Sequence, residues 1–236
     1  MSEPFFRFPR TPHLAWLGSG QPRDDKVLSS EEARELLDGE VVVEEKIDGA
    51  NLGLSVDAHG RLRAQNRGSY VARERSAPQF KHLFAWLDQR ASELVDALAP
   101  DLILFGEWCY AVHAIRYTRL PDWFIAFDVY DRARGEFWSV PRRDALIERL
   151  GLALVPRIAS GRFDLEGLRR LLGPSRFTDG PAEGIYVRRD EGDHLRARAK
   201  LVRPEFTAAI GEHWSRRTLE RNRLAVEAPS APPRTR

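Results

Sequence analysis

The sequence predicts an α+β fold with mostly antiparallel sheets flanked by helices. Runs of β-branched and aromatic residues outnumber the helical patterns, and short turns at 58–60, 134–135 and 191–193 join several of them. The order of these elements favours antiparallel pairing. We find no internal repeat, and 236 residues suffice for one large domain or two small ones.

The first third of the chain contains an irregular stretch, two helical patterns and three strands. Residues 1–28 are rich in Pro, Gly and Arg without any period, so we expect them to wrap the domain irregularly. Ser29 and Glu32 have the spacing of a capping box and predict a helix over 29–38. The best helix is expected at 78–98, where apolar residues form one stripe after a proline in the first turn. The strands between the two helices are expected at 41–47, 52–56 and 61–66.

The remaining elements are predicted from the same periodicities. Strands are expected at 102–107, 123–130 and 136–140, and a hairpin at 185–189 and 195–202. Short helices are expected at 141–150 and 164–172, and a longer one from 204 to about 223. The Pro-rich end of the chain predicts a loose tail. The resulting division is an N-terminal wrap plus helix over 1–40, a core over 41–203, a helical segment over 204–224 and a flexible tail over 225–236.

Composition excludes several classes of protein. Lys and Arg number 37 against 35 Asp and Glu, and 42% of the residues are hydrophobic, which argues against disorder over most of the chain. No apolar run approaches the length that a membrane-spanning helix needs, and the N-terminus lacks the apolar segment of a signal peptide. Cys109 is the only cysteine, which excludes intramolecular disulfides and cysteine-based zinc sites. We therefore predict a cytoplasmic protein with no membrane partner.

Lysine is rare in this chain, with only four residues against 33 arginines: Lys26, Lys46, Lys81 and Lys200. Arginine is a poor nucleophile because it does not lose its proton usefully, so each lysine is a candidate for chemistry. Lys46 stands out, because Lys46-Ile47-Asp48-Gly49 directly follows a strongly β-forming run. A lysine at a strand end can point its amine into a cleft, and the glycine lets a ligand approach the backbone. Alone, this motif also fits an exposed lysine before a turn.

Further elements follow this motif in a fixed order. They are Asn51, Arg67, Phe105-Gly106-Glu107, Phe124-Ile125-Ala126-Phe127-Asp128, Glu183-Gly184-Ile185-Tyr186-Val187 and Arg198-Ala199-Lys200. Over about 41–202, the series resembles the covalent nucleotidyltransferase superfamily of ATP-dependent ligases and capping enzymes. Glu45, Asn51 and the Phe124–Asp128 element make it most similar to the RNA ligase family, in the branch with the phage and RNA-editing ligases. The resemblance implies a nucleotidyltransferase fold (the ATP-grasp-like ligase adenylation fold) for the core over 41–203.

The resemblance also implies a reaction. A lysine amine attacks the α-phosphorus of ATP, pyrophosphate leaves, and the AMP is passed from lysine to an RNA 5′-phosphate before a 3′-hydroxyl displaces it. Lys46 matches the nucleophile, so ATP, Mg²⁺ (or Mn²⁺) and RNA with 5′-phosphate and 3′-hydroxyl ends are the expected ligands. An attacking amine must be neutral, whereas Glu45 and Asp48 favour its charged form. A divalent ion and a second cation near the phosphates would oppose them.

The remaining roles are carried over from the family position by position. Lys200, with Arg198, would supply positive charge to the α-phosphate, although the family commonly has lysine at both positions. Glu183 would bind the metal, since a carboxylate suits Mg²⁺, and Glu107 would hold the ribose hydroxyls. Each of these residues could instead belong to an ordinary solvated strand.

Four more residues are expected around the nucleotide. Glu45 matches the adenine-sensing position, and Arg67 matches an arginine that contacts the nucleotide and the RNA 5′-phosphate. Phe127 would stack on adenine, whereas Phe124, three residues earlier, faces the other side of a strand and fits a core. Asn51 would contact the RNA end, although Asn is also common in turns.

The chain departs from the larger relatives in length. About 34 residues follow residue 202, too few for the oligonucleotide-binding barrel of larger ligases, and no room exists for the domain of NAD-dependent ligases. We therefore expect a minimal ATP-dependent module. Whether sealing needs a separate end-healing or nucleic-acid-binding partner stays open. The alternatives are a catalytically silent nucleotide- or RNA-binding module on the same fold and a ligase that prefers DNA nicks.

Overall fold

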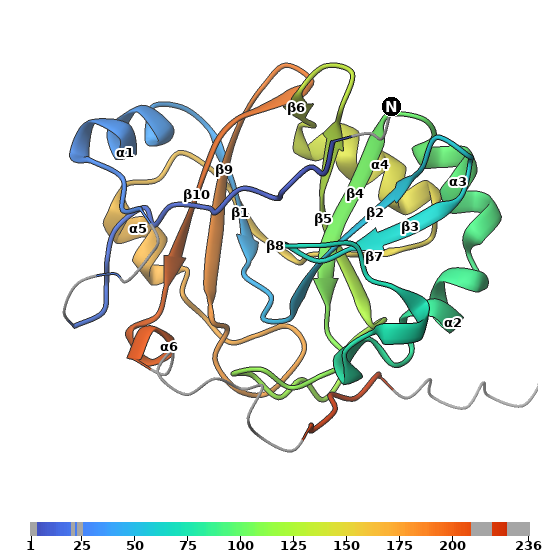
Figure 1. Ribbon diagram of the computed structural model, residues 1–236. Helices are drawn as coiled ribbons and strands as arrows, with labels where there is room; N and C mark the ends of the chain where they lie inside the picture. Colours follow the sequence, from blue (N-terminus) through green and yellow to red (C-terminus); the bar gives the residue numbers. More distant parts are fainter. Residues whose placement is uncertain (1–3, 20–21, 23–25, 209–218, 226–236) are drawn as a thin grey trace, which may run out of the picture.

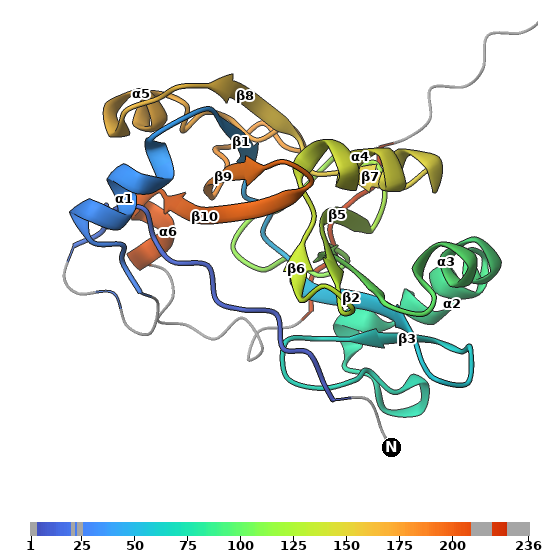
Figure 2. The same ribbon diagram turned by 90° about the horizontal axis from the view of Figure 1, so that it is seen from above.

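The computed structural model describes residues 4–19, 22, 26–208 and 219–225. Two β-sheets form its centre, with helices on the outer side of each (Figures 1 and 2). This arrangement confirms the predicted α+β class with mostly antiparallel sheets. Within the described ranges, no helix combines the length and apolar character that crossing a bilayer requires.

The smaller sheet has four antiparallel strands in the order β10-β9-β1-β8. Its strands are β1 (Val41–Glu45), β8 (Arg157–Gly161), β9 (Gly184–Glu191) and β10 (His194–Val202). The expected hairpin is present as β9 and β10, and Gly192 in its turn has a φ of +59°. The strand β8 was not predicted, because its sequence is polar and its side chains are largely exposed.

The larger sheet follows the order β3-β2-β4-β5-β6, and β7 pairs in parallel with β5. Its strands are β2 (Ala50–Val56), β3 (Leu62–Gln65), β4 (Leu102–Trp108), β5 (Phe124–Asp131), β6 (Glu136–Phe137) and β7 (Ala153–Leu154). The chain passes directly from β1 in the smaller sheet to β2 in the larger one, so the connection 46–49 joins the two sheets.

Helices cover both sheets through separate apolar cores. On the smaller sheet, α1 (Ser30–Leu37) and α5 (Leu165–Arg170) pack against valines and leucines of β1, β9 and β10. The predicted capping box of α1 is confirmed, because Ser29 and Glu32 exchange both hydrogen bonds. On the larger sheet, α2 (Leu83–Asp88), α3 (Ala91–Leu98) and α4 (Val140–Arg149) bury their apolar faces.

The single helix expected over 78–98 was wrong. This stretch contains a 3₁₀ turn (Pro78–Phe80), α2 and α3, and Arg90 between the helices has a φ of −124°, outside the helical region. The guanidinium of Arg90 binds Asp122 and lies 4.4 Å from the ring centre of Trp86. The break lets α2 and α3 both pack on the larger sheet. The apolar residues were therefore identified correctly, but they belong to two helices and not to one. A second short 3₁₀ turn lies at Arg73–Arg75.

The helical segment expected over 204–224 was correct only at its start. A helix, α6, is present at Pro204–Ala208, and residues 209–218 lie outside the described part. Residues 219–225 are not helical and pair with a distant loop through isolated bridges. Beyond Ala225, the predicted flexible tail lies outside the described residues.

Candidate active site

Lys46 lies in the connection between the two sheets, directly after β1. Its backbone N–H donates to the carbonyl of Gly184 (2.9 Å), and its amine forms an ion pair with the carboxylate of Glu183. Both side chains are about 15% exposed, so the pair is largely shielded from water. The strand pairing of β1 with β9 therefore brings together two residues that are 137 positions apart.

The charges around Lys46 favour the protonated form of its amine. Burial alone would lower the pKa of Lys46, but the carboxylates of Glu183 and Asp48 outweigh burial and raise it. From the sequence, both Asp48 and Glu45 were expected to favour the charged form of this amine. Asp48 does so, whereas Glu45 is not among the groups that raise the pKa of Lys46. The carboxylate of Glu45 instead accepts a hydrogen bond from the backbone N–H of Arg176 (2.9 Å), and burial raises the pKa of Glu45.

An open pocket beside Lys46 is lined by most of the residues that were predicted to contact the phosphates or the RNA. The predicted residues that line it are Lys46, Asn51, Arg67, Glu107 and Lys200. Residues 47–49 of the connection line it as well. Asn51 and Glu107 are direct cross-strand partners on β2 and β4. Both side-chain polar atoms of Asn51 and Oε2 of Glu107 are buried and, among the described residues, have no hydrogen-bond partner. Burial raises the pKa of Glu107 well above its usual range. These polar atoms are therefore available to a ligand.

A second, more enclosed pocket lies next to the first, and Glu107 and Tyr186 line both. Phe127 and Glu45 line this inner pocket, as does Glu44. The register of β4 against β5 shifts at this point, because Phe105 pairs with Asp128 while Gly106 pairs with Ala126. Phe127 is the extra residue of this β-bulge, and a bulge redirects a side chain.

The contrast between the two phenylalanines of β5 was predicted correctly. Phe124 is fully buried in the core beneath α2, where its ring lies 5.4 Å from that of Trp86. Phe127 is half-buried and presents its ring to the inner pocket. Its role in stacking on a base stays a prediction.

Arg198 is not placed where the sequence analysis put it. It lines the inner pocket, not the open pocket that Lys200 lines. Its guanidinium forms an ion pair with Asp128 and lies 4.6 Å from the ring centre of Phe8 and 4.3 Å from that of Phe137. These contacts place the guanidinium of Arg198 in the wall of the inner pocket, and its predicted role at the α-phosphate stays a prediction.

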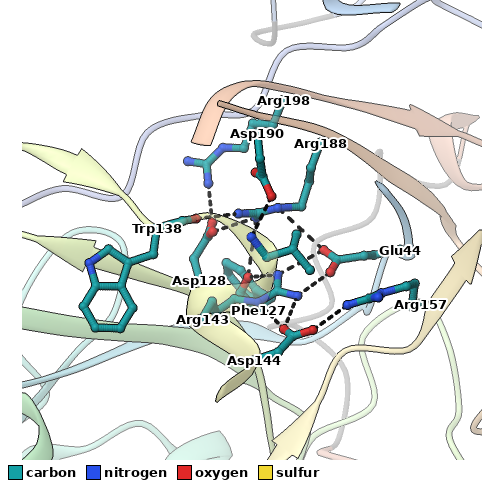
Figure 3. A network of polar contacts seen from close by, with 11 residues as sticks. Glu44, Phe127, Asp128, Trp138, Arg143, Asp144, Arg157, Arg188, Asp190 and Arg198 are labelled. Atoms are coloured by element: carbon teal, nitrogen blue, oxygen red, sulfur yellow. Dashed lines mark hydrogen bonds and ion pairs between the residues drawn. The ribbon is translucent and has the colours of Figure 1, made fainter. Parts of the chain in front are cut away.

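A buried charge network joins residues that line the inner pocket (Figure 3). Arg143 is 1% exposed and binds Glu44 through two nitrogens, at 2.5 and 3.2 Å. Its guanidinium also donates to the carbonyl of Phe127 (2.6 Å), the bulge residue. Arg188 binds Asp128 at 2.6 Å, and Asp128 is the residue that holds Arg198. The network therefore fixes the bulge and two walls of the pocket.

The N-terminal segment 4–14 forms a wall of both pockets, which the sequence analysis missed. Gln65 of β3 donates to the carbonyl of Phe6 (2.7 Å), so the segment is attached to the larger sheet. At its other end, the N–H of Lys200 donates to the carbonyl of Pro12 (2.9 Å), and the N–H of Leu14 donates to that of Lys200 (2.8 Å). The segment thus crosses from one sheet to the other and holds the backbone of Lys200 (Figure 2).

Phe8 and Thr11 of this segment, together with Tyr186 of β9, are site residues that sequence reasoning did not find. Phe8 lines the inner pocket, with its ring 5.5 Å from that of Phe127, and Thr11 lines both pockets. Tyr186 lies between the pockets, and burial raises its pKa. The only local signal was the alternation of Phe6 and Phe8, which is too short to define a strand.

Residues 39–202 match the model of the RNA ligase family. Because this match covers well over half of the chain, the protein belongs to the RNA ligase family. A comparison with curated protein sequences gives no match.

The solved structures that resemble this chain include several of an RNA ligase from Naegleria gruberi. An ATP- and Mn-containing variant matches with a TM-score of 0.66 at 15% identity, covering 88% of this chain and 59% of that one. A variant with AMP and Mn gives 0.62 at 14% identity, covering 88% and 59%. The form with PPi gives 0.59 at 16% identity, covering 87% and 64%. At such identities the likeness shows the nucleotidyltransferase-type fold alone, and the chain spans about three fifths of that ligase.

Proposed function

We propose that the protein is an ATP-dependent RNA ligase with Lys46 as its covalent nucleophile. The observation that carries this proposal is the convergence of Lys46, Glu183, Glu107 and Lys200 around adjoining pockets between the sheets of an RNA ligase family member. A silent binding module would not need a shielded lysine paired with a carboxylate.

The first step would form a bond between Nζ of Lys46 and the α-phosphorus of ATP, while the bond from that phosphorus to the pyrophosphate oxygen breaks. The amine must first lose its proton, which the charges of Glu183 and Asp48 oppose. Lys200, which lines the same pocket, would lower the pKa of Lys46 jointly with a bound cation. The AMP would then pass to the 5′-phosphate oxygen of RNA, and a 3′-hydroxyl would finally displace AMP and form the phosphodiester.

A divalent cation fits this site through Glu183. A hard carboxylate oxygen suits Mg²⁺ or Mn²⁺, which would neutralise the phosphates and release Lys46 from its ion pair. Among the described residues, no three His, Cys, Asp or Glu side chains are grouped to hold a metal. Phosphate oxygens of the nucleotide would therefore supply further ligands.

The two pockets suggest how the nucleotide would lie. The inner pocket has the aromatic face of Phe127 and Oε1 of Glu45, which has no hydrogen-bond partner within the described part of the chain. Both suit a flat base with an amino group. Glu107 lines both pockets and would receive the ribose hydroxyls at the boundary. Asn51 and Arg67 would face the RNA end in the open pocket. A cytoplasmic location and a separate end-healing partner stay predictions from the sequence.

The test is incubation of the full chain with α-labelled ATP and Mg²⁺, followed by intact-mass measurement. We expect one added AMP on the wild type and on Lys81→Ala, in which an exposed lysine is removed, and none on Lys46→Ala. Label that survives in Lys46→Ala would refute the assignment of the nucleophile. Sealing of nicked duplexes with RNA or DNA at the 3′-hydroxyl strand then separates an RNA ligase from a DNA-preferring one.

A further inference from the structure

Residues 219–225 form a strap that lies outside the span matching the ligase family. The strap pairs with the loop 109–120, which connects β4 to β5, and both lie at the same end of the sheets (Figure 1, strap in red). The backbone bonds run in both directions: Val112 N–H to Glu220 O, Asn222 N–H to Tyr110 O, Arg223 N–H to Tyr117 O, Leu120 N–H to Arg223 O, and Ala225 N–H to Leu120 O, at 2.7 to 3.0 Å. The strap thus holds the loop along most of its length.

Asn222 is the one strap side chain that is buried against the loop, with 1% of its surface exposed. Its amide nitrogen donates to the carbonyls of Cys109 (2.8 Å) and Ala111 (3.1 Å). Its amide oxygen accepts from the N–H of Tyr117 (2.8 Å). Asparagine alone among small side chains offers two donors and an acceptor in this arrangement. An aspartate of the same shape would place oxygen against two carbonyls.

The same loop is bonded to the turn that carries Lys46. One carboxylate oxygen of Asp48 accepts from the backbone N–H groups of Ala114 (2.6 Å) and Ile115 (2.8 Å). The backbone N–H of Asp48 donates to the hydroxyl of Tyr117 (2.8 Å). Ile47, next to the nucleophile, packs in one apolar cluster with Ile115 and Tyr117.

We propose that Asn222 is a positioning residue for the nucleophile. It fixes the loop, and the loop fixes the connection 46–49 through Asp48, Ile47 and the hydroxyl of Tyr117. Asn222 is buried beneath the loop and lines neither pocket, so it acts through Tyr117 and Asp48. This inference rests on the proposed function, because it assigns the strap a part in the reaction of Lys46.

Loosening the strap should change the rate of AMP transfer without changing the binding of the nucleotide. Phe127, Glu107 and Lys200 are held by the sheets, so loosening the loop leaves the pocket for base and phosphates formed. It changes the direction in which the Lys46 amine points. A displacement of the nucleophile by less than the length of a bond can lower a rate by up to roughly 100-fold.

The experiment measures single-turnover transfer of AMP to the full chain over a range of ATP concentrations. For Asn222→Asp, we expect the maximal rate constant to fall roughly 10- to 100-fold, with an unchanged half-saturating concentration of ATP. The matched control is Arg223→Gln, because Arg223 is exposed and contacts the loop only through its backbone, so its rate should equal that of the wild type. A wild-type rate for a folded Asn222→Asp protein would overturn the inference, as would a rise in half-saturation without a change of maximal rate.

A second variant tests the same connection from the other side. Tyr117→Phe keeps the buried ring and removes the hydroxyl that accepts from Asp48, so it should lower the maximal rate in the same way. Combined with Asn222→Asp, it should add little further loss, because both changes loosen one connection. If Asn222→Asp does not fold, Tyr117→Phe alone tests the inference, and a wild-type rate for Tyr117→Phe would overturn it. Absence of any AMP transfer in the wild type would instead refute the proposed function itself.

Discussion

Substitution of Arg143 tests how much the buried charge network contributes to the free energy of unfolding. The Arg143→Met substitution keeps the aliphatic stem and removes the charge. It would leave Glu44, which is 2% exposed, with the Nε of Arg188 at 3.9 Å as its one remaining ion-pair partner among the described residues. Removing one partner of a buried ion pair costs about 3–5 kcal/mol, because the other charge stays uncompensated. Since a domain of this kind is stable by about 5–15 kcal/mol in total, this loss is a large share.

The assay is urea denaturation, in which the free energy of unfolding is obtained from the midpoint and the slope. Arg157→Met is the matched control, because Arg157 belongs to the same network through Asp144 but its side chain is half-exposed. Its loss should cost less than about 1 kcal/mol. The double variant Arg143→Met/Glu44→Gln should be more stable than the sum of the single changes predicts. The reasoning fails if Arg143→Met lies within about 1 kcal/mol of the wild type, or if Arg157→Met costs as much.

Three further changes test the site. In Gly184→Ala, the new Cβ would lie 2.3 Å from a backbone oxygen of β10, so we expect a loss of about 1–3 kcal/mol in urea denaturation, whereas Gly68→Ala, with its nearest atom at 3.7 Å, should be neutral. Phe127→Leu should weaken ATP binding in calorimetry by about 0.5–1.5 kcal/mol, and unchanged affinity would argue against base stacking. Glu183→Gln should lower the pKa of Lys46, so acylation of Lys46 near neutral pH, followed by mass spectrometry with the other lysines as internal references, should become faster; an unaltered rate would contradict the role of the ion pair.

Local sequence signals were sufficient for most of the strands, although not for β7 and β8. Lys46, Glu107, Glu183 and Lys200 were placed on strands or strand ends. In the structure, Lys46, Glu107 and Lys200 line one pocket, and Glu183 forms an ion pair with Lys46. This worked because alternation along a strand fixes the face on which each side chain lies. The chemistry assigned to each residue stays a prediction.

Long-range pairing accounts for most of what the sequence could not predict. Residues 219–225 have a composition compatible with a helix, but their backbone bonds go to a loop about 100 positions away. The contacts of Arg198 could not be predicted for a similar reason, since Asp128, Phe8 and Phe137 all lie far from it in the sequence. The periodicity of a short stretch of sequence does not reveal partners that lie so far away in the chain.

The path of residues 4–14 limits how far the protein can be shortened. A fragment cut to residues 39–202 would keep every motif of the family, yet it would leave the outer edge of β10 unpaired at Lys200. Bare strand edges promote self-association, and the aromatic cluster around Phe105 would lose Phe6 and Phe8. A shortened protein for crystallisation should therefore keep residues 4–14 in addition to the span that matches the family.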